Sequence, residues 1–522
     1  MNTIVIFTSD NGGLFRTVHD GSRRSRLLLM VIAPRFMIHP LAIPMHLCIL
    51  YALLFSASAV AAPASDFPRA VVLIYADDLG YGDLSCYGAT RIHTPRIDSL
   101  AAHGIRFTDA HSPAAVCSPS RYALLTGRYC WRTSLKRRVL APQAPLHIET
   151  GRETLASFLK KNGYATGIIG KWHLGLGRPP ETDWNTEPIA PGPNDVGFGF
   201  SHIISGSNNF PPSVYIENGR VVDRNDGETI ELDFPPTGKG TPWWKLVEKR
   251  TISKKWVAED MGLHLAREAV EFIDAHARQP FFLYFPAPNP HLPLTPNKKF
   301  QGTSKAGAYG DFVQELDFMT GMILDALARN GLADDALVIF TSDNGGNIHP
   351  SKRTGHRANG SLRGSKGEVY EGGHRVPFIV RWPARAAAGK VSDSPISQVD
   401  LLASLHALFG EPVPPGTAPD SVNVLAALLD EETHPKDRIM IHHASNGVFA
   451  IRRGDWKLIE GIPAPDNRPD RPVRLQRKRP AANPQLFNLA KDPKEMVNVA
   501  KDHPELVADL LKQLNAVRDN GS

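Results

Sequence analysis

Several features that would place this chain in a specialised class are scarce. Four cysteines among 522 residues are too few for a disulfide scaffold. The longest uninterrupted apolar run, Leu47–Phe55, has only nine residues, which is too short to span a bilayer. The net charge is only +6, and it falls to +3 without residues 1–62. No later basic tract changes this balance, so we expect no nucleic-acid partner.

The remaining composition is that of an ordinary globular protein. It is 42% hydrophobic and 21% charged, with 43 glycines and 43 prolines. These values exclude collagen-like, low-complexity and wholly disordered chains. The length allows a large core and predicts two domains, or one large domain with an appendage.

Residues 37–61 have the pattern of a signal peptide. The run Leu47–Phe55 suits the apolar h-region, and Ala59–Ala61 (AVA) supplies the cleavage site. The alternative is a buried strand or helix. We predict a mature chain that starts near Ala62, is exported to the periplasm or the extracellular space, and keeps no membrane span.

Residues 1–36 precede this segment and contain a puzzling duplication. The sequence VIFTSDNGG occurs at Val5–Gly13 and again at Val338–Gly346, and nothing around either copy repeats. This is therefore not a repeat protein. We expect residues 1–36 to be an upstream remnant or a mis-assigned start, and the early copy, with Asp10 and Asn11, to have no site of its own.

Apolar runs alternate with helical patterns from about residue 66 to residue 415. This alternation predicts an α/β domain with a doubly wound sheet flanked by helices. Residues 420–522 instead predict a smaller α+β domain with an antiparallel sheet. The expected strands are Arg69–Ala76, Ala165–Ile169, Pro280–Pro286, Ala336–Thr341 and Val376–Arg381, and the expected helices are Glu153–Asn162, Val257–Ala277, Asp311–Asn330 and Pro504–Arg518.

Polar side chains follow three of the expected strands. Asp77 and Asp78 end the first, His291 follows the run at 280–286, and Asp343 and Asn344 follow the run at 336–341. Sites in doubly wound sheets lie outside the carboxyl ends of strands, so we expect these residues to meet. Taken alone, paired acids after a strand could equally be helix caps or solvated turns.

Cys117 lies in the segment HSPAAVCSPSR, immediately before an expected helix. A lone cysteine is usually a buried structural thiol. Here Ser118, Pro119 and a helical run after Arg121 mark a helix start, which attracts anions and lowers a thiol pKa. The residues alone suggest a nucleophilic cysteine with an arginine that binds an oxyanion, as in phosphatase-like chemistry.

The same segment resembles the signature C-x-P-S-R of the type I sulfatases, the arylsulfatase-like branch of the alkaline phosphatase superfamily. The resemblance covers nearly the whole mature chain and implies an alkaline-phosphatase-like mixed sheet. The motifs that carry it, all in the family order, are Cys117–Arg121 with Leu124–Arg128, Asp77–Gly80, Gly170–Gly175, Pro288–His291, Ser342–Gly346, Arg363–Gly367 and Leu486–Leu489.

The resemblance implies that Cys117 is oxidised to formylglycine (3-oxoalanine) by a formylglycine-generating enzyme. The hydrate of this aldehyde is the nucleophile: one hydroxyl attacks sulfur, and the second lets the aldehyde re-form and sulfate leave. By the same resemblance, Arg121 and Lys171 hold the hydrate and His173 orients or deprotonates it. His291 or Lys366 protonates the leaving oxygen, and the sequence leaves that choice open.

The resemblance also implies one divalent cation. Its ligands would be oxygen atoms, with the matured Cys117 side chain joining the set Asp77, Asp78, Asp343 and Asn344. Oxygen ligands suit a hard ion, Ca²⁺ first and Mg²⁺ second. Asn344 stands where relatives with two zinc ions have a histidine, which favours the single-cation arrangement.

The resulting prediction is an exported sulfatase that acts on sulfate monoesters of carbohydrates or aryl alcohols. The segment Pro211–Arg220 resembles arylsulfatase A and N-acetylgalactosamine-6-sulfatase relatives, which points to 6-O-sulfated galacto-sugars. The alternatives are a phosphonate monoester hydrolase or phosphodiesterase of the same superfamily, and an inactive sulfatase-like carbohydrate-binding protein. Further candidates for the substrate pocket are His349, His356, His374 and the pair Trp243–Trp244, while Cys86 and Cys130 could be free thiols or a disulfide.

Overall fold

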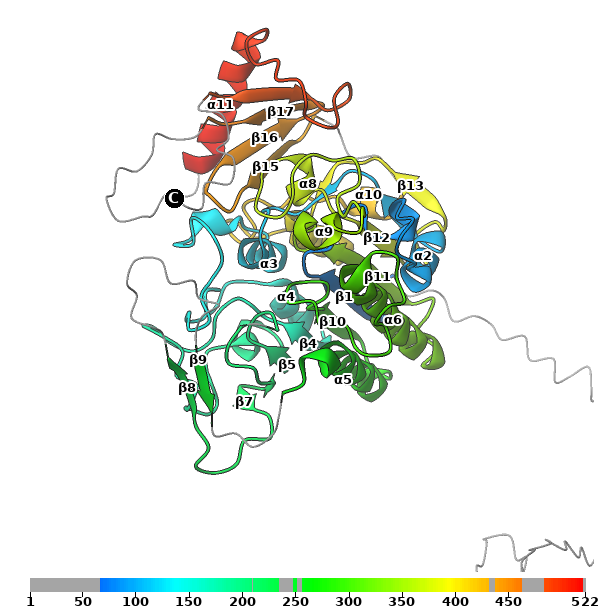
Figure 1. The fold of residues 1–522 in the computed structure, drawn as a ribbon, viewed down its shortest axis with the longest axis vertical. Helices are drawn as coiled ribbons and strands as arrows, with labels where there is room; N and C mark the ends of the chain where they lie inside the picture. The colour runs from blue at the N-terminus through cyan, green and yellow to red at the C-terminus, as the bar shows by residue number, and fades with distance from the viewer. Residues whose placement is uncertain are drawn as a thin grey trace, which may run out of the picture. The chain divides into compact units, whose positions relative to one another are not determined.

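A ten-stranded mixed sheet forms the centre of the computed structural model (Figure 1). The structure describes residues 66–208, 210–233, 247–250, 256–430, 437–461 and 483–519. The strands of this sheet are β1 (Ala70–Ala76), β2 (Ile105–Phe107), β4 (Ala165–Lys171), β5 (Phe200–Ile204), β6 (Ile216–Glu217), β7 (Arg220–Val221), β10 (Phe281–Pro286), β11 (Ala336–Ser342), β12 (Phe378–Arg381) and β13 (Lys390–Ser392).

The strand order is β13-β2-β12-β11-β1-β10-β4-β5-β6-β7. The middle strands, β11-β1-β10-β4-β5, are all parallel, and antiparallel pairs flank them. Ala76 pairs with Ser342, so β1 and β11 end side by side. The predicted mixed α/β class is confirmed.

Helices cover both faces of the sheet. Alternate residues of β1 point to opposite faces, as the two-residue period of a strand requires. Val71, Leu73 and Tyr75 pack on one side, and Val72 and Ile74 on the other. The first face carries α3 (Cys117–Thr126), α4 (Leu155–Lys161) and α9 (Leu401–Leu408), and the second carries α2 (Pro95–Ala102), α5 (Met261–His276) and α6 (Gly307–Arg329).

Helix α5 begins four residues later than predicted, because residues 258–260 form a 3₁₀ turn. Helix α6 begins four residues earlier than predicted, at Gly307. Among the described residues, no helix combines the length and the apolar character needed to cross a bilayer.

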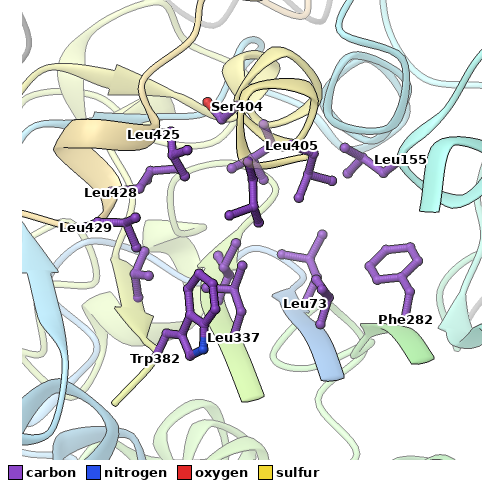
Figure 2. Close-up of a pocket in the computed structure, with 15 residues that line it drawn as sticks. Leu73, Leu155, Phe282, Leu337, Trp382, Ser404, Leu405, Leu425, Leu428 and Leu429 are labelled. Carbon is purple, nitrogen blue, oxygen red and sulfur yellow. The ribbon is translucent and has the colours of Figure 1, made fainter. Parts of the chain in front are cut away.

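A small cavity of about 30 Å³ lies between the sheet and α9 (Figure 2). Leu73, Phe282, Leu155 and Leu405 line it with other apolar side chains. This volume is near that of one water molecule, and the lining offers almost no polar partner. It is a packing gap in the core.

The carboxyl-terminal part contains a four-stranded antiparallel sheet. Its strands are β15 (Ile439–His443), β16 (Phe449–Arg453), β17 (Trp456–Ile459) and β18 (Gln485–Asn488), and α11 (Pro504–Asp519) packs on it (Figure 1). Ile441, Ile451 and Leu510 form an apolar cluster that includes Ala123 of α3. The predicted antiparallel sheet is confirmed, and the boundary between residues 415 and 420 stays a prediction.

The remaining strands and α-helices of the described chain are short. They are β3 (Ala110–His111), β8 (Ile230–Asp233), β9 (Val247–Arg250), β14 (Ile396–Ser397), α7 (Ile348–Lys352), α8 (Glu371–His374) and α10 (Leu425–Leu428). The predicted signal peptide, the early copy of the duplicated segment and Trp243–Trp244 lie outside the described residues.

Candidate active site

The acids after β1 and β11 meet at the carboxyl edge of the sheet. The backbone N–H of Asp78 donates to Asp343 Oδ1 at 3.1 Å, and Asn344 Nδ2 donates to Asp78 Oδ1 at 2.8 Å. The backbone of Asp77 also donates to the carbonyl of Asn289, which follows β10. The in-register ends of these neighbouring strands therefore bring the acids together as the sequence predicted.

Three cations face the three carboxylates. Lys171 Nζ lies 2.6 Å from Asp77 Oδ2, and Lys366 Nζ lies 2.7 Å from Asp78 Oδ1. An Arg121 terminal nitrogen donates to Asp343 Oδ2 at 2.7 Å. Lys171 ends β4, Arg121 lies on α3 and Lys366 comes from a loop after α7, so each cation reaches the cluster from a different element.

Burial and charge set the ionisation of the carboxylates. Burial disfavours the ionised form of Asp77, but Lys171, His291 and Arg121 hold its pKa well below the usual value. Burial, together with the charge of Asp77, raises the pKa of Asp343 to about 7. Additional positive charge would therefore stabilise the ionised carboxylates of this cluster.

The donor set fits a divalent cation. Asp77, Asp78, Cys117 and His291 each offer a ligand atom, and these atoms lie within 4.8 Å of one another. The buried Oδ1 of Asn344 has no hydrogen-bond partner in the described structure, although buried polar atoms normally have one. An ion beside these oxygens would satisfy Asn344 and relieve the repulsion between the carboxylates.

Cys117 is the first residue of α3 and is buried, with its Sγ 3.6 Å from Asp77 Oδ1. Burial raises the pKa of its thiol to about 12, although Lys171 and Lys366 act in the opposite direction. The expectation that the helix start lowers this pKa is therefore wrong for the unmodified thiol. Because the thiolate is the nucleophilic form, unmodified cysteine is poorly suited to attack.

The two predicted histidines lie in different surroundings. His291 Nε2 is 3.8 Å from Asp78 Oδ2, with 13% of the side chain exposed. Burial and Lys366 lower the pKa of His291 to about 4. His173 Nε2 contacts the carbonyl of Leu140 at 3.3 Å, and its ring meets Phe210 edge to face. Of the two, His291 therefore contacts the acids directly.

The other histidine and cysteine candidates have separate positions. His356 Nε2 bonds Asp83 Oδ1 at 2.6 Å, and His349 is exposed on α7. His374 is buried against the carboxyl-terminal sheet rather than in the pocket. Cys86 and Cys130 are free thiols, so the alternative of a disulfide between them is wrong.

Sequence reasoning missed Ser207. Its hydroxyl, buried just after β5, donates to Asp77 Oδ2 at 3.3 Å. The available signal was its position after a strand of the parallel sheet, but Ser207 lies in a glycine- and asparagine-rich segment, Ser205–Asn209, that resembles an ordinary loop.

Backbone hydrogen bonds hold the loop before Cys117. Ser112 donates to the carbonyl of His374, and Ala115 donates to the carbonyl of His443 at the end of β15. Gly367, next to Lys366, donates to the carbonyl of Ala115 at 2.8 Å. The carboxyl-terminal sheet thus takes part in positioning both Cys117 and Lys366.

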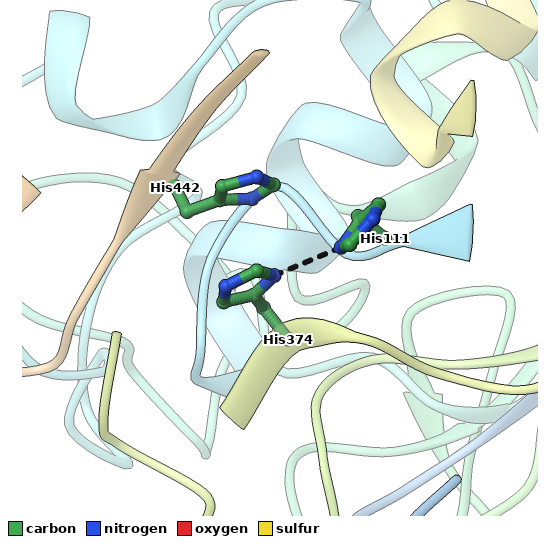
Figure 3. Close-up of side chains that lie close together, drawn as sticks. All are labelled: His111, His374 and His442. Carbon is green, nitrogen blue, oxygen red and sulfur yellow. Dashed lines mark hydrogen bonds between the residues drawn. The ribbon is translucent and has the colours of Figure 1, made fainter. Parts of the chain in front are cut away.

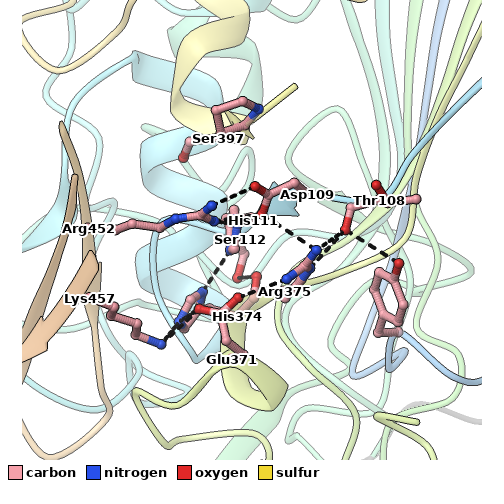
Figure 4. Close-up of polar contacts among 12 residues, drawn as sticks. Thr108, Asp109, His111, Ser112, Glu371, His374, Arg375, Ser397, Arg452 and Lys457 are labelled. Carbon is pink, nitrogen blue, oxygen red and sulfur yellow. Dashed lines mark hydrogen bonds and ion pairs between the residues drawn. The ribbon is translucent and has the colours of Figure 1, made fainter. Parts of the chain in front are cut away.

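A buried network of polar side chains supports the same loop (Figure 4). Lys457 Nζ contacts His374 Nε2 at 2.9 Å, and His374 Nδ1 lies 3.0 Å from His111 Nδ1. His111 Nε2 in turn lies 2.8 Å from Asp109, and Arg452 donates two hydrogen bonds to the Asp109 carboxylate. These contacts join β17 and β16 to the strand that leads to Cys117.

The sheet, its helices and this cluster define an alkaline-phosphatase-like hydrolase fold, and comparison with known proteins gives the family. Residues 69–411 match the sulfatase family. An N-acetylgalactosamine-6-O-sulfatase of Bacteroides thetaiotaomicron is 39% identical over 483 residues, covering 86% of this chain and 93% of the relative. Human arylsulfatase A is 35% identical over 474 residues, covering 86% and 88%.

Solved structures agree with these relatives. A Bacteroides thetaiotaomicron sulfatase, described in connection with the metabolism of multiple glycosaminoglycans, has a TM-score of 0.80 and 37% identity. The match covers 87% of this chain and 100% of that one. The chain therefore belongs to the sulfatase family and is a sulfuric ester hydrolase.

Proposed function

We propose that this sulfatase is exported and removes sulfate monoesters from glycans, with Cys117 matured to formylglycine and one Ca²⁺ ion bound. The observation that carries the proposal is the position of Cys117 Sγ, 3.6 Å from Asp77 within a buried cluster of three carboxylates and three cations. Such a cluster suits an anion whose charge must be neutralised away from water.

Burial raises the thiol pKa of Cys117 and so disfavours the nucleophilic thiolate. Maturation to formylglycine replaces the thiol with a different nucleophile. Formylglycine supplies a hydrated aldehyde, whose second hydroxyl provides a route for sulfate release that a plain serine would lack. The Arg121 guanidinium and the Lys171 ammonium lie on the Asp77 side of Cys117 and can hold hydroxyl groups at this position. His173 is the candidate for orienting the nucleophile.

The cation would be held by Asp77, Asp78, Asp343, Asn344 and the matured residue 117, and it would supply positive charge toward sulfate. All four unmodified ligands present oxygen, which favours Ca²⁺ and then Mg²⁺ over Zn²⁺. With an ion on the carboxylates, the N–H groups of Lys171 and Lys366 can turn toward a sulfate oxygen. The lysines thus bind the substrate anion that the acids alone would repel.

Two groups at the solvent side can protonate the leaving oxygen. Lys366 is 21% exposed and His291 is 13% exposed, whereas Asp77, Lys171 and Arg121 are fully buried. Substrate therefore enters past Lys366 and His291. A sugar alkoxide needs a proton from one of them far more than a nitrophenolate does.

The relatives suggest the substrate class. The Bacteroides relative is named for O-sulfate at position 6 of N-acetylgalactosamine. We accordingly propose a 6-O-sulfated galacto-configured sugar as substrate and a formylglycine-generating enzyme as maturation partner. Residues 37–61 are proposed as the signal peptide that directs export.

Mass spectrometry of protein made in its own host tests the nucleophile first. The tryptic peptide Phe107–Arg121 should carry formylglycine in place of Cys117. The same preparation is then assayed for sulfate release from N-acetylgalactosamine-6-sulfate, its gluco epimer and nitrophenyl sulfate, and for hydrolysis of the matched nitrophenyl phosphonate. Sulfate esters, with the galacto sugar preferred, should be hydrolysed fastest.

Each other result has a defined meaning. A preference for the phosphonate would replace the sulfate-ester proposal with the phosphonate monoester hydrolase alternative. Full conversion of Cys117 without hydrolysis of any ester would favour the carbohydrate-binding alternative. Hydrolysis by protein that lacks formylglycine would remove the proposed nucleophile.

A further inference from the structure

Two pairs of histidine rings in the described chain face each other through nitrogens 3.0 Å apart, and both pairs belong to three-residue clusters with metal-ligand spacing. Two neutral imidazoles can share such a contact only if one donates and the other accepts. A metal ion can replace that proton when both nitrogens present lone pairs. The other partners of each ring decide between the two situations.

In the first cluster, His111, His374 and His442, a hydrogen bond joins His111 to His374, and the ring of His442 stacks on that of His374 with 3.8 Å between the centroids (Figure 3). Lys457 can only donate and lies 2.9 Å from His374 Nε2, closer than the Val369 carbonyl at 3.1 Å, so we assign Nε2 as the acceptor and place the proton on Nδ1. His374 then donates to His111, and His111 donates to Asp109. The Lys457 ammonium also opposes a second cation beside it, and all three rings are buried. His111 and His374 thus have polar partners without an ion, and although both buried ring nitrogens of His442 have none in the described structure, the adjacent Lys457 ammonium disfavours a cation there.

The second cluster joins β5, at one side of the parallel strands, to helix α5. His202 is on β5, and its Nε2 lies 3.0 Å from Nε2 of His264 on α5. Glu268 is one turn further along the helix, with Oε1 3.9 Å from His264 Nε2. Residues four apart share a helix face, so His264 and Glu268 both point at His202.

The sheet register supplies a carboxylate behind His202. Glu217 on β6 pairs directly with His202, and its Oε2 lies 3.1 Å from His202 Nδ1. Because a carboxylate can only accept, His202 carries its proton on Nδ1 and presents the Nε2 lone pair to His264. A carboxylate on the second nitrogen is the usual support of a metal-binding histidine.

Charge and access distinguish this cluster from the buried one. Glu217, Glu268 and Glu271 supply negative charge around it, with Arg267 as a nearby cation. The side chains of His264 and Glu268 are 27% and 24% exposed. An ion can therefore enter from solvent without disturbing the core.

We propose that His202, His264 and Glu268 form a Zn²⁺ site, separate from the catalytic cluster, with water as the fourth ligand. Two nitrogens on one tetrahedral Zn²⁺ at about 2.0–2.1 Å lie about 3.3 Å apart, close to the 3.0 Å observed. Glu268 Oε1, 3.9 Å from His264 Nε2, would have to move closer to the two rings. On binding, the His264 proton occupies Nδ1, and no net proton is released from the two neutral rings.

The ion would cross-link β5 to α5 near the catalytic edge. Three residues after His202, the carbonyl of Ser205 accepts the backbone N–H of His173, and Ser207 contacts Asp77. Zn²⁺ would therefore stiffen the strand that leads to these contacts. Its main effect is on stability, because no ligand of this site belongs to the catalytic cluster.

Metal titration of the full chain tests the site. The protein is first stripped of metal and then saturated with Ca²⁺, which occupies the oxygen-ligand site. Co²⁺ is added next and should give the visible absorption bands of a tetrahedral ion, and one equivalent of Zn²⁺ should remove them. Zn²⁺ should also raise the unfolding temperature.

Variants assign the signal. His264→Ala should abolish the cobalt bands, and Glu268→Gln should weaken binding. Glu217→Gln, which alters only the support of His202, should weaken Zn²⁺ binding about 10–100-fold. His276→Ala, on the same helix, is the matched control and should bind Zn²⁺ as the unchanged protein does.

The proposal is overturned if the unchanged protein and His264→Ala bind the same number of Zn²⁺ equivalents with the same affinity. It is also overturned if His442→Phe, in the first cluster, removes the bound Zn²⁺ instead. Glu268→Gln keeps a polar side chain at a partly exposed position, so it gives the answer if His264→Ala does not fold.

Discussion

Replacement of Lys457 by methionine should strongly destabilise the protein although this residue is far from Cys117 in sequence. Its ammonium lies 2.9 Å from Glu371, 2.9 Å from Glu495 and 2.9 Å from His374 Nε2. Lys457 and both glutamates are fully buried. Methionine fills a similar volume but leaves two buried carboxylates without their shared cation.

The expected cost follows from these contacts. Removal of one partner of a buried ion pair typically costs about 3–5 kcal/mol. Burial favours the neutral form of Glu371, but Lys457, together with His111, His374 and Arg375, holds the pKa of Glu371 well below the usual value. Burial already raises the pKa of Glu495, so Glu495 can take up a proton and limit the loss. We therefore expect a loss of about 3–5 kcal/mol near neutral pH.

Urea unfolding followed by tryptophan fluorescence measures this loss. The double variant Lys457→Met/Glu495→Gln should lose less than the two single variants together, with a coupling energy of about 0.5–3 kcal/mol. Lys491→Met, at an exposed position after β18, should change stability by no more than about 0.5 kcal/mol. A loss below about 1 kcal/mol for Lys457→Met, or strict additivity in the double variant, would refute the argument.

The remaining predictions concern the active site and the histidine cluster. Cys117→Ala should abolish sulfate release while the circular dichroism spectrum is unchanged, and clear residual turnover would remove Cys117 as the nucleophile. Chelation should inactivate the enzyme, with Ca²⁺ restoring more activity than Zn²⁺; restoration by Zn²⁺ alone would contradict a hard-ion site. If Lys366 or His291 protonates the leaving group, its replacement by alanine should slow hydrolysis of a sugar sulfate far more than hydrolysis of nitrophenyl sulfate. Equal slowing with both substrates would assign the residue to sulfate binding. Burial, His111 and Lys457 lower the pKa of His442 well below its usual value. As the pH falls below about 6.5, the imidazole of His442 therefore takes up a proton only in the unfolded chain. The free energy of unfolding, measured in urea, should therefore fall between about pH 6.5 and 5. His442→Phe should reduce this pH dependence by up to about 1.4 kcal/mol per pH unit. An unchanged dependence of the unfolding free energy on pH would contradict this.

Much of the active-site neighbourhood could be predicted because its residues follow buried strands. The runs that became β1 and β11 are continuous and apolar, so their ends, Asp77 and Asp343, could be located from sequence. In a parallel sheet, strand ends of this kind converge. Convergence of the acids was therefore predictable before any distance was known.

Other features depend on contacts that no local pattern encodes. The raised thiol pKa of Cys117 depends on burial, which outweighs the nearby lysines. His374 was a candidate for the pocket because it lies near Lys366 in sequence, but α8 turns it toward β17. The pairing of His202 with His264 depends on how α5 packs on β5, and 62 residues separate the two histidines.

The burial of Cys117 at the start of α3 has a consequence for the order of events in the cell. In the folded chain only 2% of this residue is exposed, and β15 fixes the loop before it through His443. If Cys117 is oxidised as we propose, the oxidising enzyme must reach it before α3 and the carboxyl-terminal sheet have docked. Under the proposed maturation, a chain that folds unmodified would stay inactive, and the timing of synthesis, oxidation and folding would limit how much active sulfatase a cell obtains.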